Sequence, residues 1–207
     1  MRYMTFHRKM QDFPVFSTRE IQKRFPEFDA RRLVEWQEKG YIQKLRNRYY
    51  CFPESIENEQ ALFYIANTIY PPSYISLESA LAWYGIIPES TFQIMACTTR
   101  KTQQFSTPQG SFAYRHIKSP LFIGYRIEFW NKYPWKIAEI EKAVIDYLYL
   151  HPDVRTVSDL EALRWNAQVL QEEFDWEKVH KYQTYIDSTS LSQRLASFKE
   201  FLYARVR

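Results

Sequence analysis

With 207 residues, of which 45% are hydrophobic, the chain is long enough to bury a core in one large or two small domains. Charged residues interrupt every apolar run well short of the ~18 residues that a membrane span needs, and the opening MRYMTFHRKMQDF lacks the continuous apolar stretch of a secretion signal, so we expect a cytoplasmic protein without a membrane partner. The formal net charge of +4 is uneven, because residues 1–50 hold twelve Lys and Arg against six Asp and Glu, and this basic part favours a polyanionic partner.

Two helices are predicted in the first 25 residues. The first fits within residues 1–13, where four apolar residues recur at helical spacing: Tyr3, Phe6, Met10 and Phe13. Ser17 and Glu20 have the spacing of a capping box, so a second helix should start directly after Ser17. It should end near Phe25, because Pro26 cannot continue it.

A third helix is predicted between Asp29, which offers an N-cap, and Gly40, which suits the left-handed position after a helix. Leu33 and Trp36 fall on one face with Ala30, and this apolar face should turn inward. The opposite face, which should be exposed, carries Arg31, Arg32 and Glu35.

A basic hairpin is predicted after the third helix. The strand-like sequences YIQKL and RYYCF flank Arg46 and Asn47, and Asn47 can adopt the positive φ that a tight hairpin requires. Three helices and a basic hairpin in this order predict a winged helix-turn-helix, whose third helix reads base edges and whose hairpin contacts phosphates or a minor groove. The candidate DNA-binding residues are Arg19, Arg31, Arg32, Lys44, Arg46 and Arg48.

Two alternatives stay open within this domain. A winged helix can be used for protein contacts instead of DNA binding, because a fold alone does not fix a function. On the third helix, Arg31 could bind guanine with both arms of its guanidinium. Glu35 could accept a hydrogen bond from cytosine, or it could pair with Arg31 or Arg32 at helical spacing.

The composition changes after Pro53, where PESIENEQ is polar enough to link a domain of residues 1–53 to a larger domain of residues 54–207. In the larger domain we expect a helix in EQALFYIANTIY, then strands in TFQIMACTT, QQFST, GSFAYRHIK and YRIEFW, then helices from Trp135 onward. The predicted fold class is α+β. It combines the winged helix with a larger mixed α/β domain that has a small sheet and a helical C-terminal tail.

No catalytic signature is recognisable in the sequence. The four histidines are remote from one another, no G-x-S-x-G segment occurs, and Cys51 and Cys97 fit two buried thiols better than a disulfide framework. One acidic cluster could hold a divalent cation, although its spacing is also that of ion pairs on a helix surface, which we favour: Glu139, Glu141, Lys142 and Asp146. We expect no enzyme activity, metal or cofactor; a nuclease or nucleic-acid-modifying enzyme carried by a winged helix is the alternative.

Two stretches resemble a known family. YISLESALAWYGIIPES, residues 74–90, looks like the Y-x-S-x-x-S-A-L-x-x-x-G-(L/I)-(I/L)-P-E signature of the AbiEi family, the antitoxins of abortive-infection systems. IAEIEKAVIDYLYL, residues 137–150, is similar to the A-x-P-E-K-A-L-L-D segment of the same family, with Ile140 where proline is common. The resemblance spans roughly residues 5–150, and the remainder matches only as a helical tail.

The resemblance implies a winged helix that represses its own operon and a second domain that neutralises a nucleotidyltransferase-like toxin. It implies double-stranded operator DNA and a cognate toxin as partners, with the protein acting as a homodimer or as paired copies on DNA. Most motif residues have properties that suit scaffolding: Ser76, Ser79, Ala80, Leu81, Gly85, Glu141, Lys142 and Asp146. The candidates that remain for a partner surface are Arg100, Lys101 and Arg115.

Overall fold

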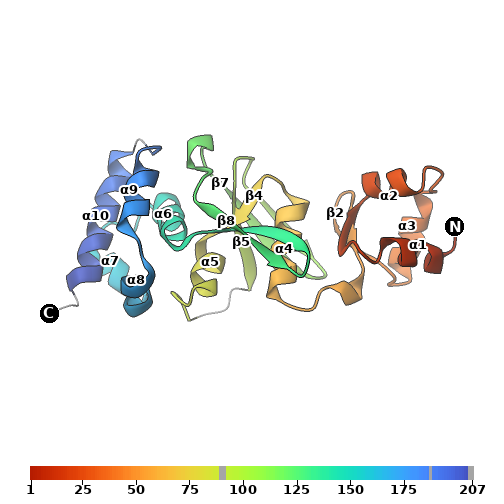
Figure 1. The fold of residues 1–207 in the computed structure, drawn as a ribbon, viewed down its shortest axis with the longest axis horizontal. Helices are drawn as coiled ribbons and strands as arrows, with labels where there is room; N and C mark the ends of the chain where they lie inside the picture. Colours follow the sequence, from red (N-terminus) through yellow and green to blue (C-terminus); the bar gives the residue numbers. More distant parts are fainter. Residues whose placement is uncertain (89–91, 187, 205–207) are drawn as a thin grey trace.

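The computed structural model describes residues 1–88, 92–186 and 188–204 of a mixed α+β fold. Three groups of elements follow one another along the long axis of the molecule (Figure 1). Small helices and a small sheet lie at the N-terminal end, a larger sheet lies in the middle, and a group of helices lies at the C-terminal end. Within the described residues, no helix combines the length and the apolar character needed to cross a membrane.

The N-terminal group consists of three helices and three short strands. The strands form an antiparallel sheet in the order β1-β3-β2. In chain order the elements are α1 (Tyr3–Met10), β1 (Val15–Ser17), α2 (Thr18–Arg24), α3 (Arg31–Glu38), β2 (Gln43–Arg46) and β3 (Tyr49–Cys51).

The expected capping box starts α2. The Ser17 hydroxyl accepts a hydrogen bond from the Glu20 backbone N–H at 3.2 Å, and the Glu20 carboxylate accepts one from the Ser17 N–H at 2.6 Å. The start of α3 differs from the prediction, because Ala30 is the N-cap and Asp29 accepts from the Arg31 N–H at 3.0 Å instead. Gly40 has the expected positive φ of 70° after α3.

The turn of the β2–β3 hairpin corrects one prediction. The positive φ, 71°, belongs to Arg48 and not to Asn47. A shift in the strand register between Lys44 and Arg46 explains the difference, because it moves the left-handed residue along the turn.

The helices of the N-terminal group enclose a small aromatic core. Its most deeply buried side chains include Phe6, Phe16, Trp36 and Phe52, and each is at most 2% exposed. The Phe6 ring centre lies 4.8 Å from that of Trp36, so α1 and α3 are held together by aromatic packing.

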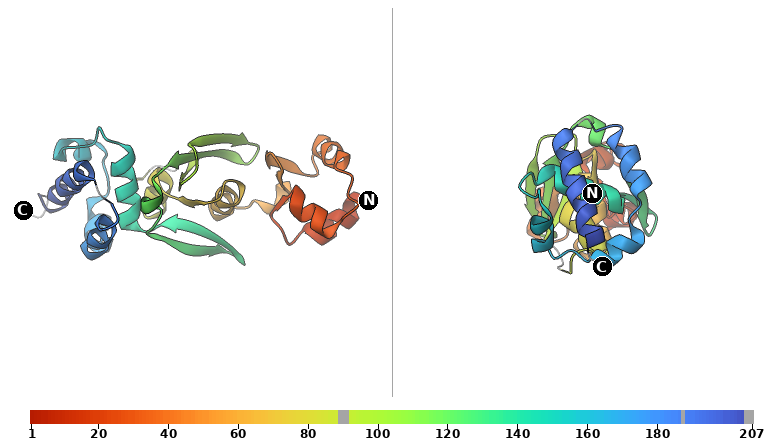
Figure 2. Two further views of the ribbon diagram at one scale, coloured as in Figure 1. Left: turned by 90° about the horizontal axis from the view of Figure 1, so that it is seen from above. Right: turned by 90° about the vertical axis from the view of Figure 1, so that its left-hand side faces the viewer.

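The larger sheet is six-stranded, which is bigger than the small sheet that the sequence predicts. Its order is β6-β7-β5-β4-β9-β8, with parallel pairing of β5 with β7 and of β4 with β9. Figure 2 shows the β6–β7 and β8–β9 hairpins on opposite sides of the molecule. Its strands are β4 (Ser73–Ile75), β5 (Gln93–Thr98), β6 (Gln103–Thr107), β7 (Gly110–His116), β8 (Tyr125–Trp130) and β9 (Tyr133–Ala138).

Two of these strands were not predicted. β4 is only three residues long, and β9 lies where we expected the helix from Trp135 to begin. Pro134 stands inside β9, and the Lys136 backbone N–H donates to the Asn67 side chain at 2.5 Å. Glu89 and Ser90 of the family-like stretch, and Thr91 of a predicted strand, lie outside the described residues.

Helices pack on the sheet and extend beyond it. α4 contacts β4 and β9, while α6 contacts α5, α9 and α10. The helices are α4 (Glu59–Ile69), α5 (Leu77–Trp83), α6 (Ile140–Leu150), α7 (Val157–Ala162), α8 (Ala167–Glu173), α9 (Trp176–Gln183) and α10 (Thr189–Ala204), with short 3-10 helices at Pro53–Ser55 and Ser119–Leu121.

The N-terminal group also contributes to the larger core. Val15, Leu45 and Cys51 are at most 3% exposed and belong to the same continuous core as the residues of the central sheet. The Tyr133 hydroxyl donates to the Asp12 carbonyl at 2.6 Å, which adds a second connection between the two parts. The N-terminal group is therefore fixed on the larger sheet through its three strands and the start of β9.

Candidate nucleic-acid interface

The third helix has one buried and one exposed face, as predicted, but Ala30, expected on the inward face, is exposed. Leu33 and Trp36 are 4% and 2% exposed. On the opposite face, the Arg31 side chain is 91% exposed and the Arg32 side chain is 44% exposed. A helix that buries two apolar residues while presenting two arginines to solvent has the polarity that groove binding requires.

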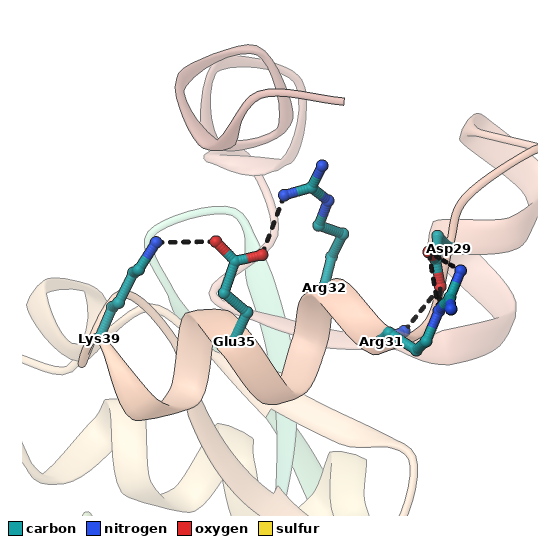
Figure 3. Close-up of polar contacts among 5 residues, drawn as sticks. All are labelled: Asp29, Arg31, Arg32, Glu35 and Lys39. Carbon is teal, nitrogen blue, oxygen red and sulfur yellow. Dashed lines mark hydrogen bonds and ion pairs between the residues drawn. The ribbon is translucent and has the colours of Figure 1, made fainter.

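The two exposed arginines of α3 are both paired with carboxylates (Figure 3). The Glu35 carboxylate bonds to Arg32 at 2.9 Å on one side and to Lys39 at 2.7 Å on the other. Arg31 pairs with Asp29 at 2.8 Å. Glu35 therefore takes the second of the two roles considered for it, as an ion-pair partner at helical spacing.

These pairs shift the pKa of the two acids. Hydrogen bonds from Lys39 and then from Arg32 lower the pKa of Glu35, and the hydrogen bond from Arg31 lowers the pKa of Asp29. Both carboxylates consequently stay ionised throughout the neutral range. An approaching phosphate would have to compete with them for Arg31, Arg32 and Lys39.

A hollow of about 330 Å³ lies beside α3 and adds residues that the sequence did not single out. Arg2 and Tyr41 line it together with Arg32 and Lys39. Tyr41 is held by Tyr3, whose ring centre is 4.5 Å away and whose hydroxyl donates to the Tyr41 carbonyl. In the sequence, only the helical spacing of Tyr3 pointed to this group of residues, since nothing there links Arg2 to Lys39.

Three further candidates are exposed: Arg19 on α2, Lys44 on β2 and Arg48 in the hairpin turn. The Thr18 backbone N–H donates to the Arg48 carbonyl at 2.9 Å, which holds the turn against the first turn of α2. Arg19 follows Thr18 directly, so the fold brings the backbones of Arg19 and Arg48 close together.

Arg46 does not lie free at the hairpin tip, which corrects its expected role as a phosphate contact. Its guanidinium donates to the Ile69 carbonyl at 2.6 Å and lies over the rings of Tyr70 and Phe105, 4.8 and 4.7 Å from their centres. The side of the hairpin that carries Arg46 faces the larger sheet, because β2 packs against β6. Arg46 therefore connects the β2–β3 hairpin to the end of α4 and to β6.

The three candidates for a partner surface do not form one patch of free charge. Arg100 is exposed, but its guanidinium lies 4.5 Å from the Tyr70 ring centre and donates to the Pro71 carbonyl at 3.2 Å. Lys101 is exposed, and its carbonyl accepts from the Tyr70 hydroxyl at 2.9 Å. Arg115 is half-buried on β7.

Three of the four residues of the acidic cluster, Glu141, Lys142 and Asp146, are buried on α6, so the prediction of ion pairs on a helix surface is wrong in its location. Lys142 and Asp146 pair with each other and are 0% exposed. The Tyr74 and Ser76 hydroxyls donate to the other Asp146 oxygen at 2.8 and 2.7 Å. Tyr74 and Ser76 come from the other family-like stretch, so the two stretches meet in one buried polar network.

Glu139 and Glu141 share one cationic partner, Lys178, at 2.9 and 3.6 Å. Glu141 is 2% exposed and accepts from the Asp175 backbone N–H at 2.9 Å. Glu139 accepts from the Tyr182 hydroxyl and pairs with Lys178, both at 2.9 Å, which ties α6 to α9. Across the described ranges, no three His, Cys, Asp or Glu side chains converge as a metal site would require.

The chain was also compared with known proteins. No family model matches it, and no curated protein matches its sequence. The similarity of residues 74–90 and 137–150 to AbiEi proteins therefore stays a prediction, and the functional argument depends on the geometry described above.

Proposed function

We propose that the protein is a DNA-binding regulator whose N-terminal group acts as a winged helix. The order of its elements and the β1-β3-β2 sheet support this assignment. The observation that carries the proposal is the exposed face of α3, where Arg31 and Arg32 stand outside a buried apolar face. Eight residues of helix are about 12 Å long, which is comparable to the width of the major groove.

In this proposal the ion pairs of α3 open when DNA binds. Arg32 and Lys39 leave the Glu35 carboxylate and bind phosphates or base edges instead. Arg31 leaves Asp29 in the same way. All three pairs are exposed, and exposed pairs stabilise a fold only weakly, so their loss is a small cost for binding. Intramolecular pairing also reduces attraction to random sequences, since non-specific affinity depends on free positive charge.

Lys44 and Arg48 supply the phosphate contacts of the wing in this account, and Arg46 is removed from the set. Because α3 is short, one copy reads few base pairs, and two copies on neighbouring half-sites would raise the sequence specificity. Operator DNA bound by a homodimer or by paired copies fits this need.

Fluorescence anisotropy tests the proposal directly. Two labelled duplexes are each titrated with the protein. One is the DNA upstream of its own gene, and the other is a scrambled duplex of equal length and composition. We expect at least a hundredfold tighter binding to the upstream duplex. Equal and weak binding to both duplexes would instead favour a winged helix used for protein contacts.

We further propose that the protein is the antitoxin of an AbiE-like pair, on the basis of the two family-like stretches. Tyr74, Ser76, Lys142 and Asp146 meet in the core, which fits a scaffold that both stretches build. Co-expression with the neighbouring toxin gene should restore growth. Continued growth arrest in the presence of folded protein would refute the antitoxin role while leaving DNA binding untouched.

The nuclease alternative has less support. Glu141 and Asp146 are buried, and a buried carboxylate cannot reach the phosphodiester of a polymer. Incubation of the purified protein with DNA and RNA, with and without Mg²⁺ or Mn²⁺, should leave both substrates intact.

A further inference from the structure

A polar hollow is lined by residues near the C-terminal helices. Figure 1 shows these helices at the opposite end of the molecule from the N-terminal group. The hollow is lined by Arg155, which precedes α7, and by three residues near the start of α10: Ser190, Gln193 and Arg194. α7 and α10 pack against each other, so the hollow lies between two contacting elements. Its volume is about 230 Å³.

Arg194 is the unusual member of this group. It is only 6% exposed, and a terminal nitrogen of its guanidinium bonds to the Ser190 hydroxyl at 2.8 Å. Its Nε is buried and has no hydrogen-bond partner among the described residues, nor do they supply a carboxylate that pairs with it. A buried cation without a counter-charge is costly, which indicates that the site is built to receive an anion.

The second arginine increases this positive potential. The Arg155 side chain is exposed, and its Nε donates to the Pro152 carbonyl at 2.7 Å, while the Asp159 carboxylate accepts from the Arg155 backbone N–H at 3.0 Å. Burial, together with repulsion from Arg155, lowers the pKa of Arg194. Two cations that repel each other across a polar hollow are stabilised by an anion between them.

The local helix geometry acts in the same direction. α10 has sixteen residues, and Ser190 and Gln193 belong to its first turns. The N-terminal end of a helix carries partial positive charge, which favours bound anions. The Ser190 hydroxyl and the Gln193 amide can each donate to an oxygen of such an anion.

We propose that this hollow binds an oxyanion of the phosphate class, either inorganic phosphate or the phosphate group of a nucleotide. Arg194 and Arg155 each supply a guanidinium, the group whose forked donors recognise phosphate in other sites. This site is independent of the DNA-binding proposal, since it shares no residue with α3 or the β2–β3 hairpin.

The test is a titration of the full chain with phosphate, in which isothermal calorimetry measures binding. Chloride keeps the ionic strength constant. We expect saturable binding, and we expect Arg155→Ala to weaken it at least tenfold. The matched control is Lys181→Ala, which removes an exposed positive charge from the neighbouring α9 without touching the hollow. Its affinity for phosphate should equal that of the unmodified chain.

A second variant keeps the proposal falsifiable through stability. Arg194→Gln should abolish phosphate binding while thermal stability in chloride stays equal or rises, because an uncompensated buried charge is removed. If Arg194→Gln does not fold, Arg155→Ala decides the question. Absence of saturable phosphate binding, or equal affinity in Arg155→Ala, would overturn the proposal.

Nucleotide titrations distinguish the two sources of the anion. Tighter binding of a nucleoside monophosphate than of inorganic phosphate would identify a nucleotide ligand. Equal affinity for both would identify the phosphate group alone as the recognised unit, and either outcome supports the site.

Discussion

The guanidinium carbon of Arg46 lies 4.8 Å from the ring centre of Tyr70, and Arg100 lies over the same ring at 4.5 Å. Arg46 also donates to the Ile69 carbonyl at 2.6 Å. A residue of the β2–β3 hairpin is thereby joined to the end of α4. The orientation of α3 relative to the larger domain consequently depends on this contact.

Replacement of Arg46 should therefore reduce stability. Arg46→Ala loses a charged hydrogen bond and two cation–π contacts, and we expect a loss of about 2 kcal/mol in the free energy of unfolding. Lys44→Ala is the matched control, because Lys44 is exposed on the same strand. Urea unfolding should separate the two variants, and equal stability would contradict the role of Arg46 as a joint.

The buried pair on α6 predicts a larger effect. Asp146→Ala leaves Lys142 buried without a counter-charge, so we expect a loss of about 3–5 kcal/mol, measured by urea unfolding. The double variant Lys142→Met/Asp146→Leu should recover most of this loss, since no charge then remains buried. Lys132→Ala removes the exposed pair with Asp12 and should cost less than about 1 kcal/mol. A small effect of Asp146→Ala would show that Lys142 is not a buried cation.

Glu35→Gln should strengthen DNA binding. The substitution frees Arg32 and Lys39 from their shared carboxylate, so non-specific affinity should rise by roughly tenfold and the dependence on salt should become steeper. Because the pKa of Glu35 is lowered, its carboxylate stays ionised as the pH falls from 7 to 5.5, and this pH change should not reproduce the effect. Weaker binding of Glu35→Gln to the upstream duplex alone would instead show that Glu35 reads a base.

Both thiols should be unreactive in the folded protein. Burial, with a smaller contribution from Glu54, raises the pKa of Cys51 to about 12, and burial followed by the Asp146 charge raises the pKa of Cys97 well above its usual range. Raised pKa values mean that almost no thiolate exists at pH 8, and the thiolate is the reactive form. Ellman's reagent should label neither thiol before unfolding and both in urea. Rapid labelling of one thiol in the native protein would contradict the buried arrangement.

Local signals in the sequence were reliable where the interactions that fix an element are themselves local. The capping box of Ser17 and Glu20 located the start of α2, and the strands in QQFST and YRIEFW have the expected bounds. The inward face of α3 also follows from spacing alone, because Leu33 and Trp36 are close in sequence. These features need no knowledge of the rest of the chain.

Features that depend on distant contacts were not predictable. The i, i+4 spacing of Lys142 and Asp146 is the same on an exposed or a buried helix face, and their partner Tyr74 is 68 residues before Lys142. The role of Arg46 depends on a carbonyl 23 residues away. β9 runs almost directly into α6, so its apolar residues were read as part of one helix.

The measurement that tests the central claim most directly is the salt dependence of binding to the upstream duplex, compared between the unmodified chain and Arg31→Ala/Arg32→Ala. We predict tight, sequence-selective binding that the double variant loses, with a salt slope that is shallower by about one to two units because up to two DNA contacts are removed. Lys181→Ala, far from α3, should behave like the unmodified chain. Unchanged affinity and slope in Arg31→Ala/Arg32→Ala would show that α3 does not read DNA.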